Sequence, residues 1–96
     1  MAEHYVARNP QTAWRVYEGE AVILRAEDST LNTLNAVGTL IWETADGKTP
    51  VSAIVGRICE EFDVEPAEAR RDADAFIERL ARRGLVTVSE RPQDEA

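Results

Sequence analysis

The sequence predicts an α+β domain in which a three-stranded antiparallel sheet packs on three helices. Branched and aromatic residues interrupted by turn signals dominate residues 13–34, whereas apolar residues at helical spacing dominate residues 35–84. A group of strands followed by a group of helices is typical of the α+β class. The chain has 96 residues, 44% of them hydrophobic, which suits one packed core rather than two. We therefore expect a single domain over residues 1–96, with a core of about residues 13–88.

The three strands are short and are expected near residues 14–18, 20–26 and 30–34. Gly19 and the pair Asp28-Ser29 mark the turns between them. Strands joined by such short turns pair in antiparallel fashion. Residues 1–11 and 90–96 carry no comparable pattern, so we expect both ends to be frayed and flexible.

Three helices follow the strands. The first is indicated by Val37, Leu40 and Ile41, which recur on one helical face. Asn35 is placed to cap its first turn. The pair Asp46-Gly47 is expected to end it.

The second helix is expected over about residues 50–62, with Thr49 as its cap and the proline at its first position. Its apolar stripe consists of Val51, Ile54, Val55, Ile58, Cys59 and Phe62. The third helix starts around Pro66 and stops at Gly84. The residues on its core face are Ala69, Ala73, Phe76, Ile77 and Leu80. A short extended segment follows over residues 85–88.

The chain offers little material for catalysis. His4 is the single histidine and lies in the expected N-terminal fray, which leaves no histidine triad and no multi-histidine metal site. Cys59 is the single cysteine, and its place on an apolar stripe favours core packing over a role as nucleophile. The carboxylates lie beside arginines on helix surfaces, and no glycine-rich phosphate loop is present. We expect no enzyme activity, no catalytic residue, no metal and no cofactor.

The charge balance limits the partners. A net charge of −7 and a pI of about 4.6 work against binding to nucleic acid or to an anionic membrane. The sequence has no signal-peptide segment and no apolar stretch long enough to span a membrane. With one cysteine, no intramolecular disulfide can form. We expect a cytoplasmic protein without a membrane segment.

Two helices, a turn and an extended segment also describe a winged helix-turn-helix-like domain, whose second helix would enter the major groove of DNA. The helix over residues 67–83 would take that role. Its charged residues are Arg70, Arg71, Arg79, Arg82 and Arg83 against Glu68, Asp72, Asp74 and Glu78, a local excess of one positive charge. Because the whole chain is strongly acidic, a DNA-binding regulator is the alternative hypothesis and not the leading one. A subunit that binds only a protein partner is a third one.

A longer pattern runs through the chain over about residues 14–88. It consists of the run from Leu31 to Glu43, then Asp46-Gly47, Thr49, Val51, Ile54, Phe62, Asp72, Phe76, Ile77, Leu80 and Gly84-Leu85-Val86. The pattern resembles the PqqD family. The resemblance implies a non-catalytic peptide chaperone that binds the leader of a ribosomally made precursor peptide and presents it to a modifying enzyme. In the biosynthesis of pyrroloquinoline quinone, that partner is a radical S-adenosylmethionine enzyme.

The resemblance also implies that the leader adds as a strand to the edge of the sheet, beside the third helix. An exposed edge has backbone N–H and C=O groups that an extended peptide can pair with. The expected peptide-binding residues are Leu31, Asn32, Thr33 and Leu34 on the receiving edge and Arg71, Asp74, Ala75 and Glu78 on the groove wall. The sequence leaves open which flank of the third helix meets the strand.

The edge residues also have a plain structural reading. At least one of Leu31 and Leu34 is expected to pack in the core, and Asn35 could serve only as a cap. Trp42 is expected in the core, whereas the place of Trp14 stays open. Exposed strand edges also allow exchange of strands between two chains, so a homodimer could form.

Overall fold

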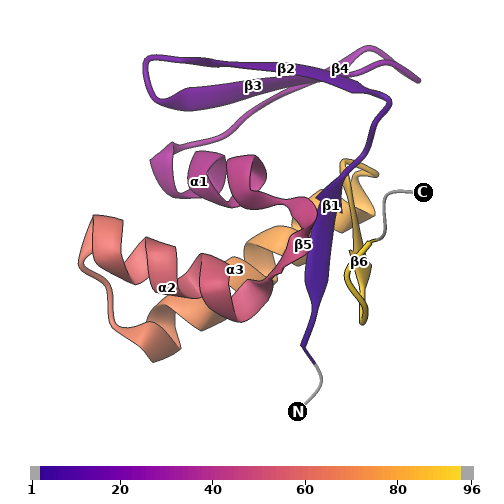
Figure 1. The fold of residues 1–96 in the computed structure, drawn as a ribbon. Coiled ribbons are helices and arrows are strands. Elements are labelled where there is room, and N and C mark those ends of the chain that lie inside the picture. Colours follow the sequence, from indigo (N-terminus) through magenta and orange to yellow (C-terminus); the bar gives the residue numbers. More distant parts are fainter. Residues whose placement is uncertain (1–2, 94–96) are drawn as a thin grey trace.

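The computed structural model describes residues 3–93, which fold into two small sheets around three helices (Figure 1). The elements are β1 (Tyr5–Arg8), β2 (Thr12–Tyr17), β3 (Glu20–Arg25), β4 (Thr30–Thr33), α1 (Ala36–Thr44), β5 (Asp46–Pro50), α2 (Val51–Phe62), α3 (Pro66–Arg82) and β6 (Val86–Ser89). The α+β class, the three helices and the extended segment after the third helix are confirmed.

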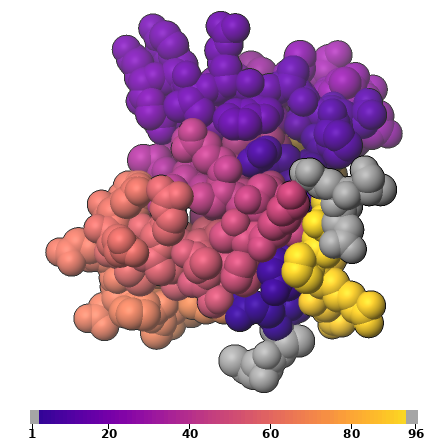
Figure 2. Space-filling model, viewed as in Figure 1, coloured from indigo at the N-terminus to yellow at the C-terminus, as the bar shows by residue number. Residues whose placement is uncertain are grey.

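The expected meander forms the first sheet, in the order β2-β3-β4 with both pairs antiparallel. The turn between β2 and β3 has positive φ at Glu18 and Gly19, which is typical of a tight hairpin whose twist matches its strands. The inner face of the sheet lies against α1, and the indigo residues of β2 and β3 form a layer above this helix in Figure 2. Ala21 and Ile23 of β3 are fully buried there.

The hydroxyl of Thr39 joins α1 to this sheet. Thr39 Oγ1 accepts a hydrogen bond from the backbone N–H of Ala21 (2.7 Å) and lies 3.4 Å from the carbonyl oxygen of Leu34, to which it donates. Thr39 is 4% exposed, so both backbone groups are satisfied without water.

A second sheet, in the order β5-β1-β6, contains residues 5–8, so the prediction of a flexible N-terminal segment over residues 1–11 is wrong there, while residues 1–2 lie outside the described part. β1 is the central strand and pairs antiparallel with both neighbours. Val6 is fully buried. A four-residue strand has too short an alternation to stand out in the sequence, and its two partners lie far along the chain. The C-terminal segment over residues 90–96 was also expected to be flexible. Within it, Gln93 donates its N–H to Gly47 O at 2.8 Å, and residues 94–96 lie outside the described part.

The helix termini match the expected caps in part. Asn35 Oδ1 accepts from the N–H of Gly38 at 2.8 Å, which confirms the cap of α1. The predicted cap at Thr49 is wrong: Pro50 is the N-cap of α2, and Thr49 lies in β5 with its hydroxyl bonded to Asp46. This happens because the chain pairs with β1 right up to the start of the helix. A residue with a positive φ, Gly84, follows the end of α3 as predicted.

The core lies between the first sheet, the helices and β1. Its largest fully buried side chains are Trp42, Ile23, Ile41, Ile54, Leu80, Leu85 and Val6. Trp42 is thus a core residue as expected, and Trp14 packs edge-on against it with 5.9 Å between ring centroids while staying 39% exposed. Cys59 is half-buried against the core. In the described part of the chain, no helix is both long and apolar enough to cross a membrane.

The buried position of β1 makes its side chains sensitive to truncation. We expect Val6→Ala to lower the free energy of unfolding by about 2 kcal/mol, because it removes two methyl groups from a site without water. Val88, the partner of Val6 on β6, is 44% exposed and supplies a matched control. Val88→Ala should cost less than about 0.5 kcal/mol. Urea unfolding measures both values, and equal costs would contradict the burial of β1.

Asp46 supports the turn that leads into β5. Partial burial raises the pKa of Asp46, but hydrogen bonds from the backbone N–H groups of Lys48 and Thr49 (both 2.8 Å) outweigh it and hold the pKa below its ordinary value. The ionised carboxylate therefore stabilises the fold at pH values above its unfolded pKa, and this contribution is lost as the pH falls through the lower folded pKa.

We expect Asp46→Ala to destabilise the protein by about 1 kcal/mol at neutral pH, because two backbone donors lose their charged acceptor at an exposed turn. The difference from the parent protein should shrink below about pH 4. Urea unfolding of both proteins at a series of pH values tests this, and a difference that stays constant into acid would rule out the carboxylate as the cause.

Candidate functional site

β4 is an edge strand with a free side. Leu34, just after the strand, donates its N–H to Ala21 O of β3 at 2.8 Å. In an antiparallel pair, residues alternate between bonding to the partner strand and pointing away from it. The backbone groups of Asn32 therefore face β3, opposite Ile23, whereas those of Leu31 and Thr33 face the open edge. This edge is available to an extended peptide.

The side chains of the predicted edge residues have different surroundings. Leu34 is 5% exposed and belongs to the core, which confirms that one of the two leucines packs there. Leu31 is 64% exposed and lies opposite Leu24 on the outer face of the sheet. Thr33 is also exposed. Asn32 points inward, and its Oδ1 accepts a hydrogen bond from Arg83 Nη1 at 3.1 Å.

Two hollows flank this edge. The first, of about 420 Å³, lies between the start of α1 and the middle of α3, and we call it the α1–α3 hollow. Its lining includes Asn35, Val37, Gly38, Ala75, Phe76 and Arg79. The second, of about 360 Å³, lies between β4 and the end of α3, and we call it the β4–α3 hollow. Its lining is Arg25, Asp28, Thr30, Asn32 and Arg83.

β4 and α3 run in opposite directions along these hollows. Asn32 of β4 bonds to Arg83, the C-cap of α3, while Asn35, further along the chain, shares a hollow with Phe76 and Arg79, which come earlier in α3. We call the free edge of β4 and these two neighbouring hollows together the β4 groove.

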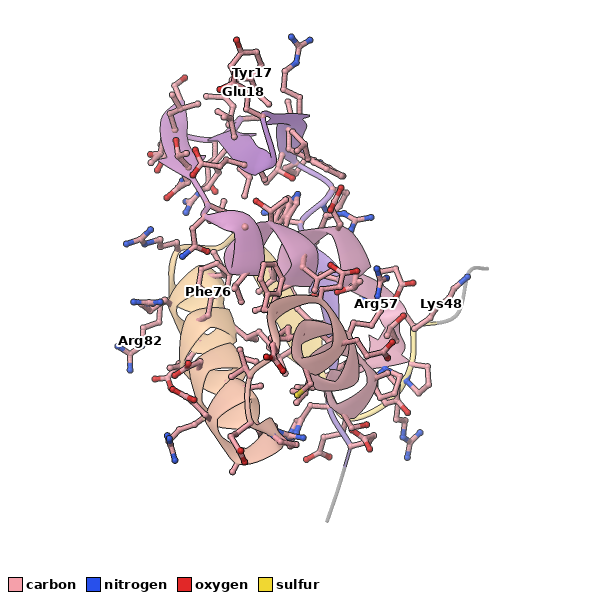
Figure 3. The ribbon with its side chains drawn as sticks, turned by 90° about the vertical axis from the view of Figure 1, so that its left-hand side faces the viewer. Tyr17, Glu18, Lys48, Arg57, Phe76 and Arg82 are labelled. Carbon is pink, nitrogen blue, oxygen red and sulfur yellow. The ribbon has the colours of Figure 1, made fainter. Side chains whose placement is uncertain are left out.

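Phe76 forms the floor of the α1–α3 hollow. Figure 3 shows it between α3 and α1, and the Arg79 guanidinium lies 5.6 Å from its ring centroid. A Cβ on Gly38 would lie 2.6 Å from the Phe76 ring, closer than side-chain carbons approach one another. The absence of a side chain at position 38 is therefore what lets α3 come this close to α1.

The structure shows which flank of α3 faces β4. Ala75 lines the α1–α3 hollow together with Asn35, the residue that follows the predicted edge residues in the chain. Asp74 and Glu78 line a different hollow, together with His4 and Val88 near the second sheet. The exposed Arg71 lines neither of the two hollows of the β4 groove. The predicted wall residues are therefore divided between two flanks, because periodicity locates the core face of a helix but not the neighbours of its polar flanks.

Sequence reasoning missed four residues of this site. Gly38 and Phe76 belong to the family-like pattern but were expected only as pattern and core residues, whereas Arg79 and Arg83 were expected only as part of the helix charge. A signal for the two arginines was present: neither has a carboxylate three or four residues away in the sequence. Within residues 3–93, no group of three or more His, Cys, Asp or Glu side chains is arranged to hold a metal ion.

Comparisons with known proteins agree with this geometry. The family model described as "Coenzyme PQQ synthesis protein D (PqqD)" matches residues 20–86. No curated protein matches the chain. Among solved structures, TbiB1 in complex with the TbiA(beta) leader peptide is 28% identical, with a TM-score of 0.77 over 83% of this chain and 93% of that chain. Lasso peptide synthetase B1 complexed with the leader peptide is 22% identical, with a TM-score of 0.74 over 85% and 96% of the two chains, and shows likeness of fold.

The contact between Gly38 and Phe76 can be tested by a double-mutant cycle. We expect Gly38→Ala to destabilise the protein by about 1–2 kcal/mol, because its new methyl group overlaps the ring. In a Phe76→Ala background the same change should stabilise it by up to about 1 kcal/mol, since alanine is the better helix former. Urea unfolding measures all four proteins. A Gly38→Ala effect of the same sign in both backgrounds would contradict the close contact.

Proposed function

Because this chain belongs to the PqqD family, we propose that it is a non-catalytic chaperone that binds the leader of a ribosomally made precursor peptide. The leader adds as a strand to β4 and is presented to a modifying enzyme. The observation that carries the proposal is the free edge formed by Leu31 and Thr33 next to two hollows. The complex of the 28% identical TbiB1 with a leader peptide supports it.

The free edge and the hollows would contribute different parts of the binding free energy. Leu31 and Thr33 offer two N–H and two C=O groups to a peptide, and each hydrogen bond contributes about 1 kcal/mol net. A sum of about 4 kcal/mol corresponds to a millimolar dissociation constant. Micromolar binding needs about twice that, so side chains in the hollows must supply the remainder and the choice of sequence.

The partner proteins follow from the family and from the edges. We propose a radical S-adenosylmethionine enzyme or another peptide-modifying enzyme as the recipient, and a cytoplasmic location, where ribosomally made precursors first become available. The far edge of the same sheet, β2, is also open, and strand pairing there would give a homodimer.

The alternative, a DNA-binding regulator, gains no support from the described residues. Two arginines of α3, Arg70 and Arg82, are already in ion pairs with Asp74 and Glu78, and Figure 3 shows Arg82 pointing away from the helix. The net charge of −7 also works against binding to phosphates.

Strand addition predicts that binding depends on every second amide of the leader. The probe is a synthetic leader from the precursor gene nearest to the gene of this chain. Titration should shift the amide signals of Leu31 and Thr33 in NMR spectra, and N-methylation of alternate leader residues should abolish binding while methylation of the intervening ones leaves it nearly unchanged. Binding that is lost without this alternation, or no binding at high micromolar concentration, would contradict the proposal.

A further inference from the structure

The β4 groove contains arginines without a carboxylate partner. Four other arginines have a carboxylate within 4.0 Å. They form the pairs Arg25–Glu27, Arg57–Glu61, Arg70–Asp74 and Arg82–Glu78, and of these only Arg25 lines the groove. Arg79 and Arg83 have none among residues 3–93. Both line the groove, Arg79 from α3 and Arg83 from the C-cap position that follows it.

Both guanidinium groups are held in place by neutral contacts. Arg83 donates to Asn32 Oδ1 on β4, and Arg79 lies over the ring of Phe76. One turn of helix separates them, so they follow one another along the groove. These contacts leave most of their N–H donors and their full charge available to a ligand.

A third arginine adds to this end of the groove. Arg25 donates from Nη1 to the carbonyl oxygen of Arg83, so its side chain crosses from the sheet to the end of α3. Its charge is balanced by Glu27 (3.1 Å) and Asp28 (3.8 Å), but its buried Nε has no hydrogen-bond partner among the described residues. At the other end of the groove Asp72 lines the α1–α3 hollow. Positive charge is therefore concentrated toward the C-terminal end of α3.

We propose that the β4 groove selects leaders that carry an aspartate or glutamate, whose carboxylate binds Arg79 and Arg83. This rests on the proposed function, because it names the side chain recognised in the same groove. Guanidinium groups suit a carboxylate because their paired N–H donors match its two oxygens. The acidic leader residue supplies the carboxylate contact that neither arginine makes within residues 3–93.

The geometry also gives the spacing of the leader motif. An antiparallel leader strand would run from Asn35 toward Thr30, so its acidic residue would lie C-terminal to the side chain in the α1–α3 hollow. Arg83 lies seven residues after Phe76, or about 10 Å along the helix. A strand covers that distance in about three residues, and side chains on one face are an even number apart. The acidic residue should thus follow the apolar one by two or four positions.

The test measures binding of the synthetic leader to the full chain by fluorescence anisotropy. The variants are Arg79→Gln, Arg83→Gln and, as a matched control, Arg71→Gln, which removes the same charge from an exposed position of α3 outside the groove. We expect the two groove variants to bind about three- to tenfold more weakly and the control to change less than about twofold. The losses should fade between about 50 mM and about 500 mM salt.

Changes in the leader complete a double-mutant cycle with the protein variants. When each Asp or Glu of the leader is replaced in turn by its amide, one replacement should weaken binding to the parent protein, and with that peptide Arg83→Gln should cause no further loss. Arg83→Glu should recover affinity for a leader with lysine at that position. Unfolding midpoints of the variants show that they remain folded.

The outcomes separate the two proposals. If the parent protein binds the leader but Arg83→Gln weakens acid and amide peptides equally, the carboxylate contact is overturned and strand addition stands. If Arg71→Gln weakens binding as much as Arg83→Gln, the effect comes from overall charge and the inference is overturned. If the parent protein does not bind the leader at all, the proposed function itself fails.

Discussion

The hydroxyl of Thr39 fixes how the helical layer meets the sheet, and the geometry of the groove depends on it. It accepts a hydrogen bond from Ala21 N–H of β3 and donates one to the carbonyl oxygen of Leu34, which follows β4. The same two residues are joined by the bond from Leu34 N–H to Ala21 O, which sets the alternation of backbone groups along β4, so Leu31 and Thr33 face outward. Valine has the same shape as threonine but would leave two buried backbone groups with fewer partners, which is costly in a site that excludes water.

Elements with a long or sharply punctuated pattern could be predicted from the sequence. Local sequence predicts four such features, because each depends on neighbours within a few residues. They are the meander, the apolar stripe of α2, the cap at Asn35 and the end of α3 at Gly84. β1 was missed since its four residues gain their stability from partners at the far end of the chain. The sequence could not predict which flank of α3 faces β4. Both flanks are polar, and only tertiary packing distinguishes them. The unpaired arginines were nonetheless visible in the spacing of charges.

The distribution of charge gives the groove a distinct role within an acidic molecule. A net charge of −7 repels an acidic peptide over most of the surface, so nonspecific contacts are weak. The cations near the end of α3 make the groove an exception, and they line the hollows next to the free edge of β4. For an acidic peptide, repulsion by the rest of the surface would weaken binding at other sites and in other registers. Attraction by the arginines of the groove would preserve binding in the correct register.

The central place of β1 also determines the order in which the chain can fold. β1 pairs with β6, so the second sheet cannot be completed until residues 86–89 have been made. The meander needs only contacts between neighbours in sequence and can form much earlier during synthesis. The edge of β4 can therefore form before β6, the last strand of the fold, and until residues 86–89 have been made β1 has only β5 to pair with. In a newly made chain β1 thus has an unpaired side that β6 later covers, whereas the outer side of β4 stays open in the finished protein.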